Sequence, residues 1–182
     1  MIYGIILAGG KSSRMGQNKM LLPFNGEPVI FHTIKGMKPN VDHIIVVTGK
    51  YDKEIREALK GQDVEIVYNK DYELGMFSSI LTGVAKVEGD FFIIPGDCPF
   101  VKAETYQKML MGRGDIRVPR YKEQEGHPIY ISYKFKDELL SRPLDYNLKS
   151  FRDEKKYEII EVEDNNIVIN LNTVLDVINF NN

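Results

Sequence analysis

Short apolar runs rich in β-branched residues alternate with helix-length amphipathic segments from the start of the chain to residue 111. The strand-like runs cover residues 2–8, 43–48, 64–68 and 91–95, and the helical patterns cover residues 28–37, 53–59, 77–87 and 103–111. Strand–loop–helix repetition of this kind favours a mostly parallel sheet with helices on both faces. Ligands of such sheets bind at the carboxyl ends of the strands, so the loops that follow the strands are where we look for a site.

The regularity weakens after residue 112. Further strand-like runs cover residues 116–121, 128–132 and 158–162, and a polar turn at 164–166 precedes a fourth run at 167–169. Their spacing permits antiparallel pairing, and residues 173–180 are predicted to form a short final helix. Since no repeat or linker divides the sequence, we expect a single domain over residues 1–182, with the fold of a three-layer α/β/α sandwich.

Composition narrows the classes of partner. The chain has 182 residues, 43% of them hydrophobic, and a net charge of -2, so we expect no general attraction to nucleic acid or to an anionic membrane. Its apolar runs are far shorter than the roughly 20 residues that span a bilayer. Met1 leads directly into a strand-like run without a signal-type segment, and Cys98 is the one cysteine, so we expect a cytoplasmic protein.

A glycine-rich loop follows the first strand-like run. Adjacent Gly9 and Gly10 let the backbone approach a phosphate, and Arg14 and Lys19 add positive charge. The loop is not a Walker motif, which would need glycine in place of Ile5, and the sequence has no Gly-x-Gly-x-x-Gly fingerprint. We therefore predict a triphosphate cradle, against the alternative of an ordinary turn with solvated charges.

An aspartate follows the most apolar strand-like run. Asp97 lies in Pro-Gly-Asp-Cys-Pro, where its carboxylate would face the ligand crevice and suit Mg²⁺, which takes few protein oxygens and completes its shell with water and substrate phosphates. The alternative is a turn aspartate that caps the next helix. The neighbouring Cys98 is predicted to be a packing residue, since the sequence identifies no group that would activate it.

Three further segments have both functional and structural explanations. Asn172, in Asn-Leu-Asn-Thr, could complete a magnesium shell or cap a helix. The segment 75–79 opens a helix whose N–H groups and hydroxyls could hold part of a nucleotide, or whose serines could serve as caps. A lone histidine such as His127, in Gly-His-Pro, is more often structural than catalytic.

Taken together, these residues resemble the MobA/MocA-like molybdenum-cofactor nucleotidyltransferases, a family with a Rossmann-like sheet, over nearly the whole chain. The most specific part is Leu-Ala-Gly-Gly followed by Arg14-Met15-Gly16 and Lys19. The resemblance implies catalytic roles for Arg14, Lys19 and Asp97, and a Mg²⁺ ion held by Asp97 and Asn172. It implies nucleotide binding by Leu7, Ala8, Gly9, Gly10, Lys19, Asn69, Gly75, Ser78, Ser79 and Asp97.

The subfamily signals differ from one segment to another. Leu-Ala-Gly-Gly and Asn-Leu-Asn-Thr resemble the guanylyl-transferring branch, whereas segments 17–23, 75–79 and 126–128 resemble the cytidylyl-transferring branch. More segments favour CTP, so CTP is the predicted triphosphate and GTP the alternative. The stretch 145–152 lacks the glycine of the Asp-x-Gly-Ala-Arg-like pattern of the cytidylyl branch, which leaves the acceptor side open.

The resemblance predicts in-line displacement, in which an acceptor phosphate attacks the α-phosphorus and pyrophosphate leaves. A phosphate monoester is already ionised near neutral pH, so no general base is required. We expect an anionic phosphorylated acceptor of the molybdopterin type; the alternatives are a sugar- or polyol-phosphate acceptor and a nucleotide-binding module without catalysis. The cations available for the acceptor are Arg113, Arg117, Arg120, Lys122, Lys149 and Arg152, although most such residues are solvated surface charge.

Overall fold

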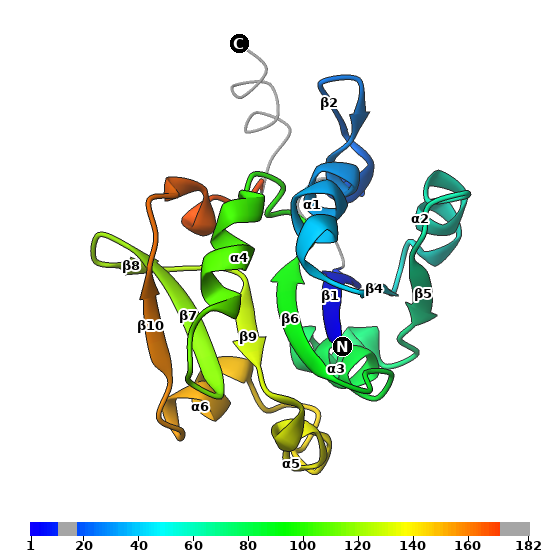
Figure 1. Ribbon diagram of the computed structural model, residues 1–182. Helices are drawn as coiled ribbons and strands as arrows, with labels where there is room; N and C mark the ends of the chain where they lie inside the picture. The colour runs from blue at the N-terminus through cyan, green and yellow to red at the C-terminus, as the bar shows by residue number, and fades with distance from the viewer. Residues whose placement is uncertain (11–17, 172–182) are drawn as a thin grey trace.

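A single eight-stranded sheet forms the centre of the protein. The computed structural model describes residues 1–10 and 18–171. The strand order is β10-β7-β9-β6-β1-β4-β5, with β8 paired antiparallel to the last two residues of β7, Arg120 and Tyr121. The strands are β1 (Ile2–Ala8), β4 (His43–Thr48), β5 (Glu65–Tyr68), β6 (Asp90–Pro95), β7 (Ile116–Tyr121), β8 (Gln124–Glu125), β9 (Ile129–Ile131) and β10 (Glu158–Glu161). Figure 1 shows the sheet running through the molecule from β10 to β5.

The first half of the chain builds the parallel part of the sheet. β1 pairs in parallel with β4 and β6, and β4 pairs in parallel with β5. β9 pairs antiparallel with β6 and β7, and β10 pairs in parallel with β7. The carboxyl end of β6 and the start of β9 therefore lie at the same edge of the sheet, which brings Asp97 and the Gly-His-Pro segment to one side of the molecule.

Helices cover both faces, as in a three-layer sandwich (Figure 1). The helices are α1 (Val29–Met37), α2 (Asp52–Ala58), α3 (Met76–Val84), α4 (Ala103–Leu110), α5 (Lys136–Leu140) and α6 (Leu148–Asp153). One core cluster joins α1, α2 and α4 to Ile6, Val46 and Phe92, and the other joins α3, α5 and α6 to Ile5, Val47 and Phe91. Successive residues of each strand thus enter opposite cores, which explains why β1, β4 and β6 are apolar almost throughout.

Short elements complete the connections. They are the 3-10 helices η1 (Lys19–Leu21), η2 (Lys38–Asn40), η3 (Tyr72–Leu74), η4 (Tyr133–Phe135) and η5 (Asn165–Val168), and a hairpin of β2 (Pro23–Phe24) with β3 (Glu27–Pro28). Asn25 and Gly26 turn that hairpin with positive φ angles of 48° and 81°, as a type I′ turn requires. No helix in residues 1–10 and 18–171 is long and apolar enough to cross a membrane.

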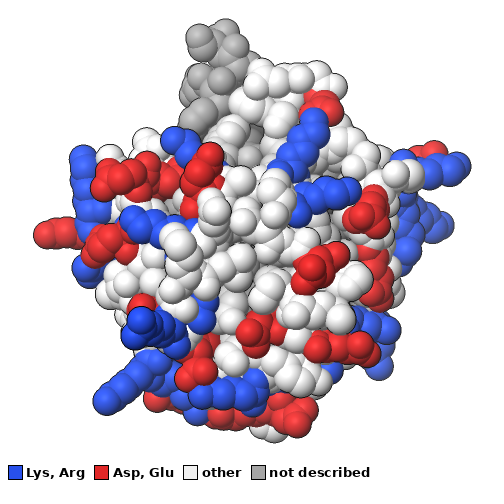
Figure 2. Space-filling view, viewed as in Figure 1, with Lys and Arg blue, Asp and Glu red and all other residues white. Residues whose placement is uncertain are grey.

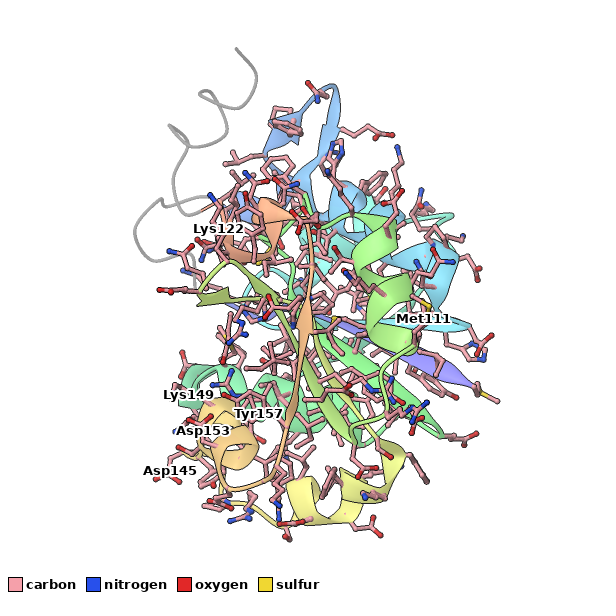
Figure 3. The ribbon with its side chains drawn as sticks, turned by 60° about the vertical axis from the view of Figure 1, so that its left-hand side comes forward. Met111, Lys122, Asp145, Lys149, Asp153 and Tyr157 are labelled. Carbon is pink, nitrogen blue, oxygen red and sulfur yellow. The ribbon has the colours of Figure 1, made fainter. Side chains whose placement is uncertain are left out.

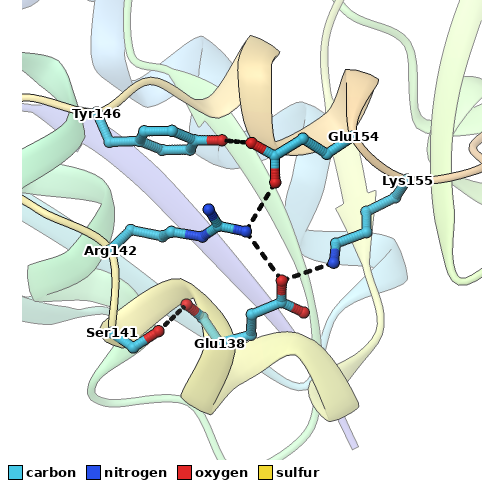
Figure 4. Close-up of polar contacts among 6 residues, drawn as sticks. All are labelled: Glu138, Ser141, Arg142, Tyr146, Glu154 and Lys155. Carbon is cyan, nitrogen blue, oxygen red and sulfur yellow. Dashed lines mark hydrogen bonds and ion pairs between the residues drawn. The ribbon is translucent and has the colours of Figure 1, made fainter.

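An ion-pair network fixes α5 and α6 on the α3 face (Figure 4). Arg142 donates to Glu138 at 3.0 Å and to Glu154 at 2.7 Å, and Lys155 donates to Glu138 at 2.6 Å. Tyr146 also donates to Glu154, and its ring packs against Phe77 of α3. These contacts hold the long connection between β9 and β10 against the sheet.

The mostly parallel α/β fold is confirmed, and the strand expected at residues 167–169 is wrong. That segment belongs to η5, because the buried carboxylate of Asp164 caps it by accepting a hydrogen bond from the backbone N–H of Asn166. Asp164 also accepts hydrogen bonds from the backbone N–H of Lys102 and the hydroxyl of Thr105, which anchors the turn to α4. The predicted helix at 173–180 lies outside the described residues.

Candidate active site

A cavity of about 350 Å³ lies at the carboxyl edge of β1 and β6, where a doubly covered parallel sheet binds its ligands. It is lined by Leu7, Gly9, Gly10, Lys19, Met20, Tyr72, Glu73, Gly75, Met76, Ser79, Pro95 and Asp97. A larger cavity of about 710 Å³ lies at the opposite edge, beside Tyr3, His43 and Glu65. The smaller cavity is the candidate site because the glycine loop and Asp97 meet there.

The two glycines after β1 face different surroundings. A methyl group added to Gly9 would lie 2.6 Å from the Ser79 hydroxyl, so this backbone packs closely against the start of α3. A methyl group added to Gly10 would meet no described atom within 4 Å. Gly9 therefore serves close packing within the protein, whereas the described residues leave space around Gly10, which lines the cavity.

Lys19 and Asp97 form an ion pair at one end of the cavity. Lys19 lies on η1, whose start is fixed by Asn18 accepting a hydrogen bond from the backbone N–H of Met20 at 3.1 Å. Asp97 follows β6 and is 6% exposed. The pair places a carboxylate and an ammonium group beside the glycine loop, the combination that a metal-bound triphosphate requires.

Cys98, next to Asp97, is a packing residue. Its side chain is 2% exposed and belongs to the core cluster that includes Tyr106 and Tyr130. Burial, reinforced by the negative charge of Asp97, raises the pKa of the Cys98 thiol far above its usual range. A thiol that stays protonated is a poor nucleophile, so the sequence-based assignment of Cys98 to packing agrees with its environment.

Asn69 supports the cavity from behind. It is 2% exposed, its amide donates to the hydroxyls of Ser78 at 2.8 Å and Ser79 at 3.0 Å, and its carbonyl accepts from the backbone N–H of Asp71 at 2.9 Å. Ser78 is also buried. Its hydroxyl accepts a hydrogen bond from Asn69 and donates one to the Asp71 carbonyl, so these protein groups occupy it. Only Ser79 of these three lines the cavity.

The Gly-His-Pro segment lies on the other side of Asp97. The His127 backbone N–H donates to the Ile167 carbonyl at 2.8 Å, and the Leu171 backbone N–H donates to the Asp97 carbonyl at 2.8 Å. Burial, together with the positive charge of Arg152, lowers the pKa of His127, although the negative charge of Asp97 acts in the opposite sense. The chain after β10 therefore links the His127 loop to the Asp97 loop.

Most cations considered for the acceptor are engaged in the protein. Arg117 is buried and donates to the Gly114 and Met109 carbonyls at 2.7 and 2.9 Å, at the far end of β7 from Asp97. Arg120 pairs with Glu161, and Arg152 pairs with Glu125 at 2.8 Å.

Two more of these cations lie at the surface in Figure 3, which labels Lys149 on α6 and Lys122 beyond β7. Lys149 pairs with Asp153 at 2.6 Å. On the face shown in Figure 2, basic and acidic side chains are interspersed, unlike the continuous basic surface typical of nucleic-acid binders.

The predicted site residues separate into three groups. Leu7, Gly9, Gly10, Lys19, Gly75, Ser79 and Asp97 line the cavity. Ala8, Asn69 and Ser78 are buried beside the cavity and are not among its lining residues. Arg14 and Asn172 lie outside the described residues.

Sequence reasoning missed Met20, Tyr72 and Glu73, which also line the cavity. Tyr72 and Glu73 lie between Asn69 and Gly75, which were both predicted as site residues. Their position between these two residues was the sequence signal that could have identified them. A methyl group on Gly49 would lie 2.7 Å from Cβ of Tyr72, which shows how closely η3 packs on the loop after β4.

A magnesium ion fits the donors of this edge. No cluster of three or more His, Cys, Asp or Glu side chains able to hold a metal occurs in the described part of the chain. Mg²⁺ typically uses one or two protein carboxylates and takes its other oxygens from water and phosphates. A single carboxylate such as Asp97 therefore suits Mg²⁺, whereas a metal such as zinc would need several protein ligands. The Leu171 N–H donates to the main-chain carbonyl of Asp97 at 2.8 Å, and Asn172, the second predicted ligand, lies outside the described residues.

A family model described as the MobA-like NTP transferase domain matches residues 4–159. The chain belongs to this family. It is 30% identical to the molybdenum cofactor cytidylyltransferase of Escherichia coli (strain K12), over 96% of this chain and 92% of that protein. It is 29% identical to a probable molybdenum cofactor guanylyltransferase of Thermococcus sibiricus, over 72% of this chain and 68% of that one.

The solved structure of a nucleotidyl transferase from Methanothermobacter thermautotroptrophicus superposes with a TM-score of 0.83 at 26% identity, covering 100% of this chain and 96% of the other. Family membership and this likeness confirm the predicted family and fold. The protein is thus a nucleotidyltransferase enzyme with a MobA-like domain.

Proposed function

We propose that the enzyme transfers CMP from CTP to a molybdopterin-type phosphorylated acceptor, with Mg²⁺ and with release of pyrophosphate. The observation that carries this proposal is the ion pair of Lys19 and Asp97 beside the glycine loop, at one end of a cavity that continues past Gly10 to Tyr72. The end-to-end match to a cytidylyltransferase supports the choice of CTP. GTP is the second candidate, supported by the match to a probable guanylyltransferase.

The order of the strands supports one orientation of the triphosphate. Asp97 follows β6, the glycine loop follows β1 and Tyr72 lies beyond β4 and β5, so these groups succeed one another across the sheet edge. The phosphates would lie by Lys19 and Asp97, and the nucleoside would lie across Gly10 toward Tyr72. The described residues leave space around Gly10, where the backbone N–H groups that follow β1 would approach the phosphate oxygens.

The acceptor phosphate oxygen attacks the α-phosphorus, the bond from that phosphorus to the bridging β-phosphate oxygen breaks, and pyrophosphate leaves with the electron pair. Lys19 neutralises charge on the triphosphate, and the loop N–H groups align it. Asp97 and Asn172 would hold Mg²⁺, which when bound supplies positive charge to the phosphates. No protein base is required, because the attacking phosphate is already ionised near neutral pH.

Pyrophosphate release tests the proposal. The purified chain is mixed with CTP or GTP and Mg²⁺, with and without molybdopterin-type acceptor, and sugar- and polyol-phosphates form a second acceptor series. Release that needs CTP and molybdopterin supports the proposal, and release only with GTP assigns the guanylyl alternative. Release only with a sugar- or polyol-phosphate would refute the acceptor, and no release with any pair would refute the reaction.

A further inference from the structure

We propose that Glu73 selects the nucleotide, by accepting hydrogen bonds from an amino group on the edge of the base. The proposal rests on the proposed function, because it assigns the base end of the same cavity. Glu73 lines that cavity, and its side chain is exposed. In the described part of the chain, no hydrogen bond or ion pair occupies its carboxylate, which is therefore available to a ligand.

The strand order separates Glu73 from the phosphate end. The loop after β6 carries Asp97, and β1 and β4 stand between β6 and β5 in the sheet. With neighbouring strands about 4.8 Å apart, the end of β5 lies about 14 Å from the end of β6. Glu73 follows β5, on η3, so the backbone that carries it lies across the sheet edge from the loop that carries Asp97.

The backbone that leads into Glu73 is held in place by two sets of contacts. The Asp71 N–H donates to Asn69 at 2.9 Å, and the Asp71 carbonyl accepts from Ser78 at 2.9 Å. Tyr72 packs against the backbone of Gly49. A carboxylate on a backbone fixed in this way loses little freedom when it binds, which is what a selective contact needs.

The walls near Glu73 suit a planar base. Tyr72 and Met76 line the cavity on either side of Glu73 in the sequence, and Met76 is 62% exposed. Aromatic and thioether side chains pack well against flat aromatic rings. Glu73 is the one carboxylate besides Asp97 among the described residues that line the cavity, so it is the acceptor available to the edge of the base.

A carboxylate only accepts hydrogen bonds, so it distinguishes bases by their donors. Cytosine presents its 4-amino group, and glutamate is a standard partner for that group. Guanine presents an N–H and its 2-amino group side by side, which a carboxylate can accept together. Uracil replaces the amino group by a carbonyl oxygen that a carboxylate repels, and hypoxanthine lacks the 2-amino group of guanine. Amino-bearing bases are thus the chemical class that this position favours.

Nucleotide affinity tests this selection without turnover. Isothermal titration of the full chain with Mg²⁺ and CTP, UTP, GTP or ITP gives two ratios of dissociation constants, UTP to CTP and ITP to GTP. We expect wild type to prefer the amino-bearing member of one pair by about ten- to a hundredfold. A preference for CTP over UTP would indicate a cytidylyl-transferring enzyme, and a preference for GTP over ITP would indicate a guanylyl-transferring enzyme.

In Glu73→Gln that preference should fall to about threefold or less, because the glutamine amide can donate as well as accept. Glu54→Gln is the matched control: Glu54 is an exposed glutamate in the first turn of α2 and does not line the cavity. It removes the same charge and should keep the wild-type ratio. Inorganic triphosphate should bind wild type and Glu73→Gln within about threefold of each other, since Glu73 lies at the base end.

Three results would overturn the proposal: wild type that discriminates within neither pair, Glu73→Gln that keeps the wild-type ratio, or Glu54→Gln that lowers the ratio as much. In each of these cases, acceptor-dependent pyrophosphate release by wild type would leave the proposed function standing. A chain that binds none of the four nucleotides would refute the proposed function and this inference together.

Discussion

The ammonium group of Lys19 forms an ion pair with the carboxylate of Asp97, although 78 positions separate them in the sequence. The two side chains are only 20% and 8% exposed. Charges withdrawn from water in this way depend on each other, because removing one weakens the electrostatic compensation of the other. The glycine loop region and the loop after β6 therefore act as one electrostatic unit.

Asp97→Asn should fold and lose about 10²–10³-fold in the rate of pyrophosphate release, because the amide no longer offers the negative charge that holds a magnesium-bound triphosphate. Circular dichroism checks the fold, and a steady-state assay with Mg²⁺ measures the rate. Asp63→Asn, at a side chain that is 92% exposed, is the control and should keep wild-type activity. Full activity of Asp97→Asn with Mg²⁺ would contradict the role of this carboxylate.

Gly10→Ala should have the same free energy of unfolding in urea as wild type, within about 0.5 kcal/mol. It should bind nucleotide at least about tenfold more weakly. Its new methyl group meets no described atom within 4 Å and would extend into the cavity. Gly49→Ala is the opposite case, since its methyl group would lie 2.7 Å from the Gly9 carbonyl oxygen and should destabilise the fold. Unchanged affinity in Gly10→Ala would show that no ligand approaches this backbone.

Asn69→Asp should lower the free energy of unfolding by about 2–4 kcal/mol, because it buries a charge and removes both hydrogen bonds to Ser78 and Ser79. Urea unfolding measures the loss. The exposed Asn165 provides the control Asn165→Asp, which should change stability by no more than about 0.5 kcal/mol. Equal effects of the two substitutions would refute the supporting role of Asn69.

Asp90 should give the protein an acid-sensitive part of its stability. Burial alone would raise its pKa, but hydrogen bonds from the Tyr130 hydroxyl at 2.6 Å and the Tyr133 backbone N–H at 2.7 Å outweigh it, so the pKa is lowered. A carboxyl group with a lowered folded-state pKa stabilises the fold fully above its unfolded pKa of about 3.9, and this stabilisation is lost as pH falls through the folded value.

Asp90→Asn should therefore be about 1–3 kcal/mol less stable than wild type at pH 7, and this difference should shrink as pH falls below about 4. Urea unfolding at pH 7, 4 and 3 measures it. A difference that stays constant over this range would mean that the charge of Asp90 does not contribute.

Cys98 should resist thiol reagents in the native protein, because it is buried and its thiol pKa is raised by that burial and by Asp97. N-ethylmaleimide should label it at least about a hundredfold more slowly than in urea. Cys98→Ala should keep pyrophosphate release within about threefold of wild type. Rapid labelling of the folded chain would show that this core opens.

The sequence predicted the central strands well because they are buried on both faces. β1, β4 and β6 carry nearly unbroken apolar runs, and a pattern of that kind has few other folded solutions. The segment at 167–169 has the same apolar character but forms a 3-10 turn, since the side chain that decides it, Asp164, acts through contacts with α4 that no local pattern contains.

Site residues that directly follow a strand could be predicted from the sequence. Site residues that tertiary packing brings to the cavity could not. Gly10 and Asp97 follow strands, which was the reason to predict them as site residues, and both line the cavity. The hydrogen bonds of Asn69 to Ser78 and Ser79 could not be read from the sequence, because they depend on how α3 packs beside the segment after β5. Glu73 was missed because the contacts that bring η3 to the cavity, such as the packing of Tyr72 on Gly49 and the hydrogen bond from Ser78 to the Asp71 carbonyl, are tertiary and leave no local pattern.

The hydrogen bond from the Leu171 N–H to the Asp97 carbonyl has a consequence for how the enzyme is made in a cell. During synthesis, β1, β4, β5 and β6 can pair while the ribosome is still translating the second half of the chain. The loop with Asp97 gains its last described backbone partner only after residue 171 has emerged. Chains released before that point would lack this hydrogen bond to the Asp97 loop, so we expect an incomplete product to be a poor enzyme.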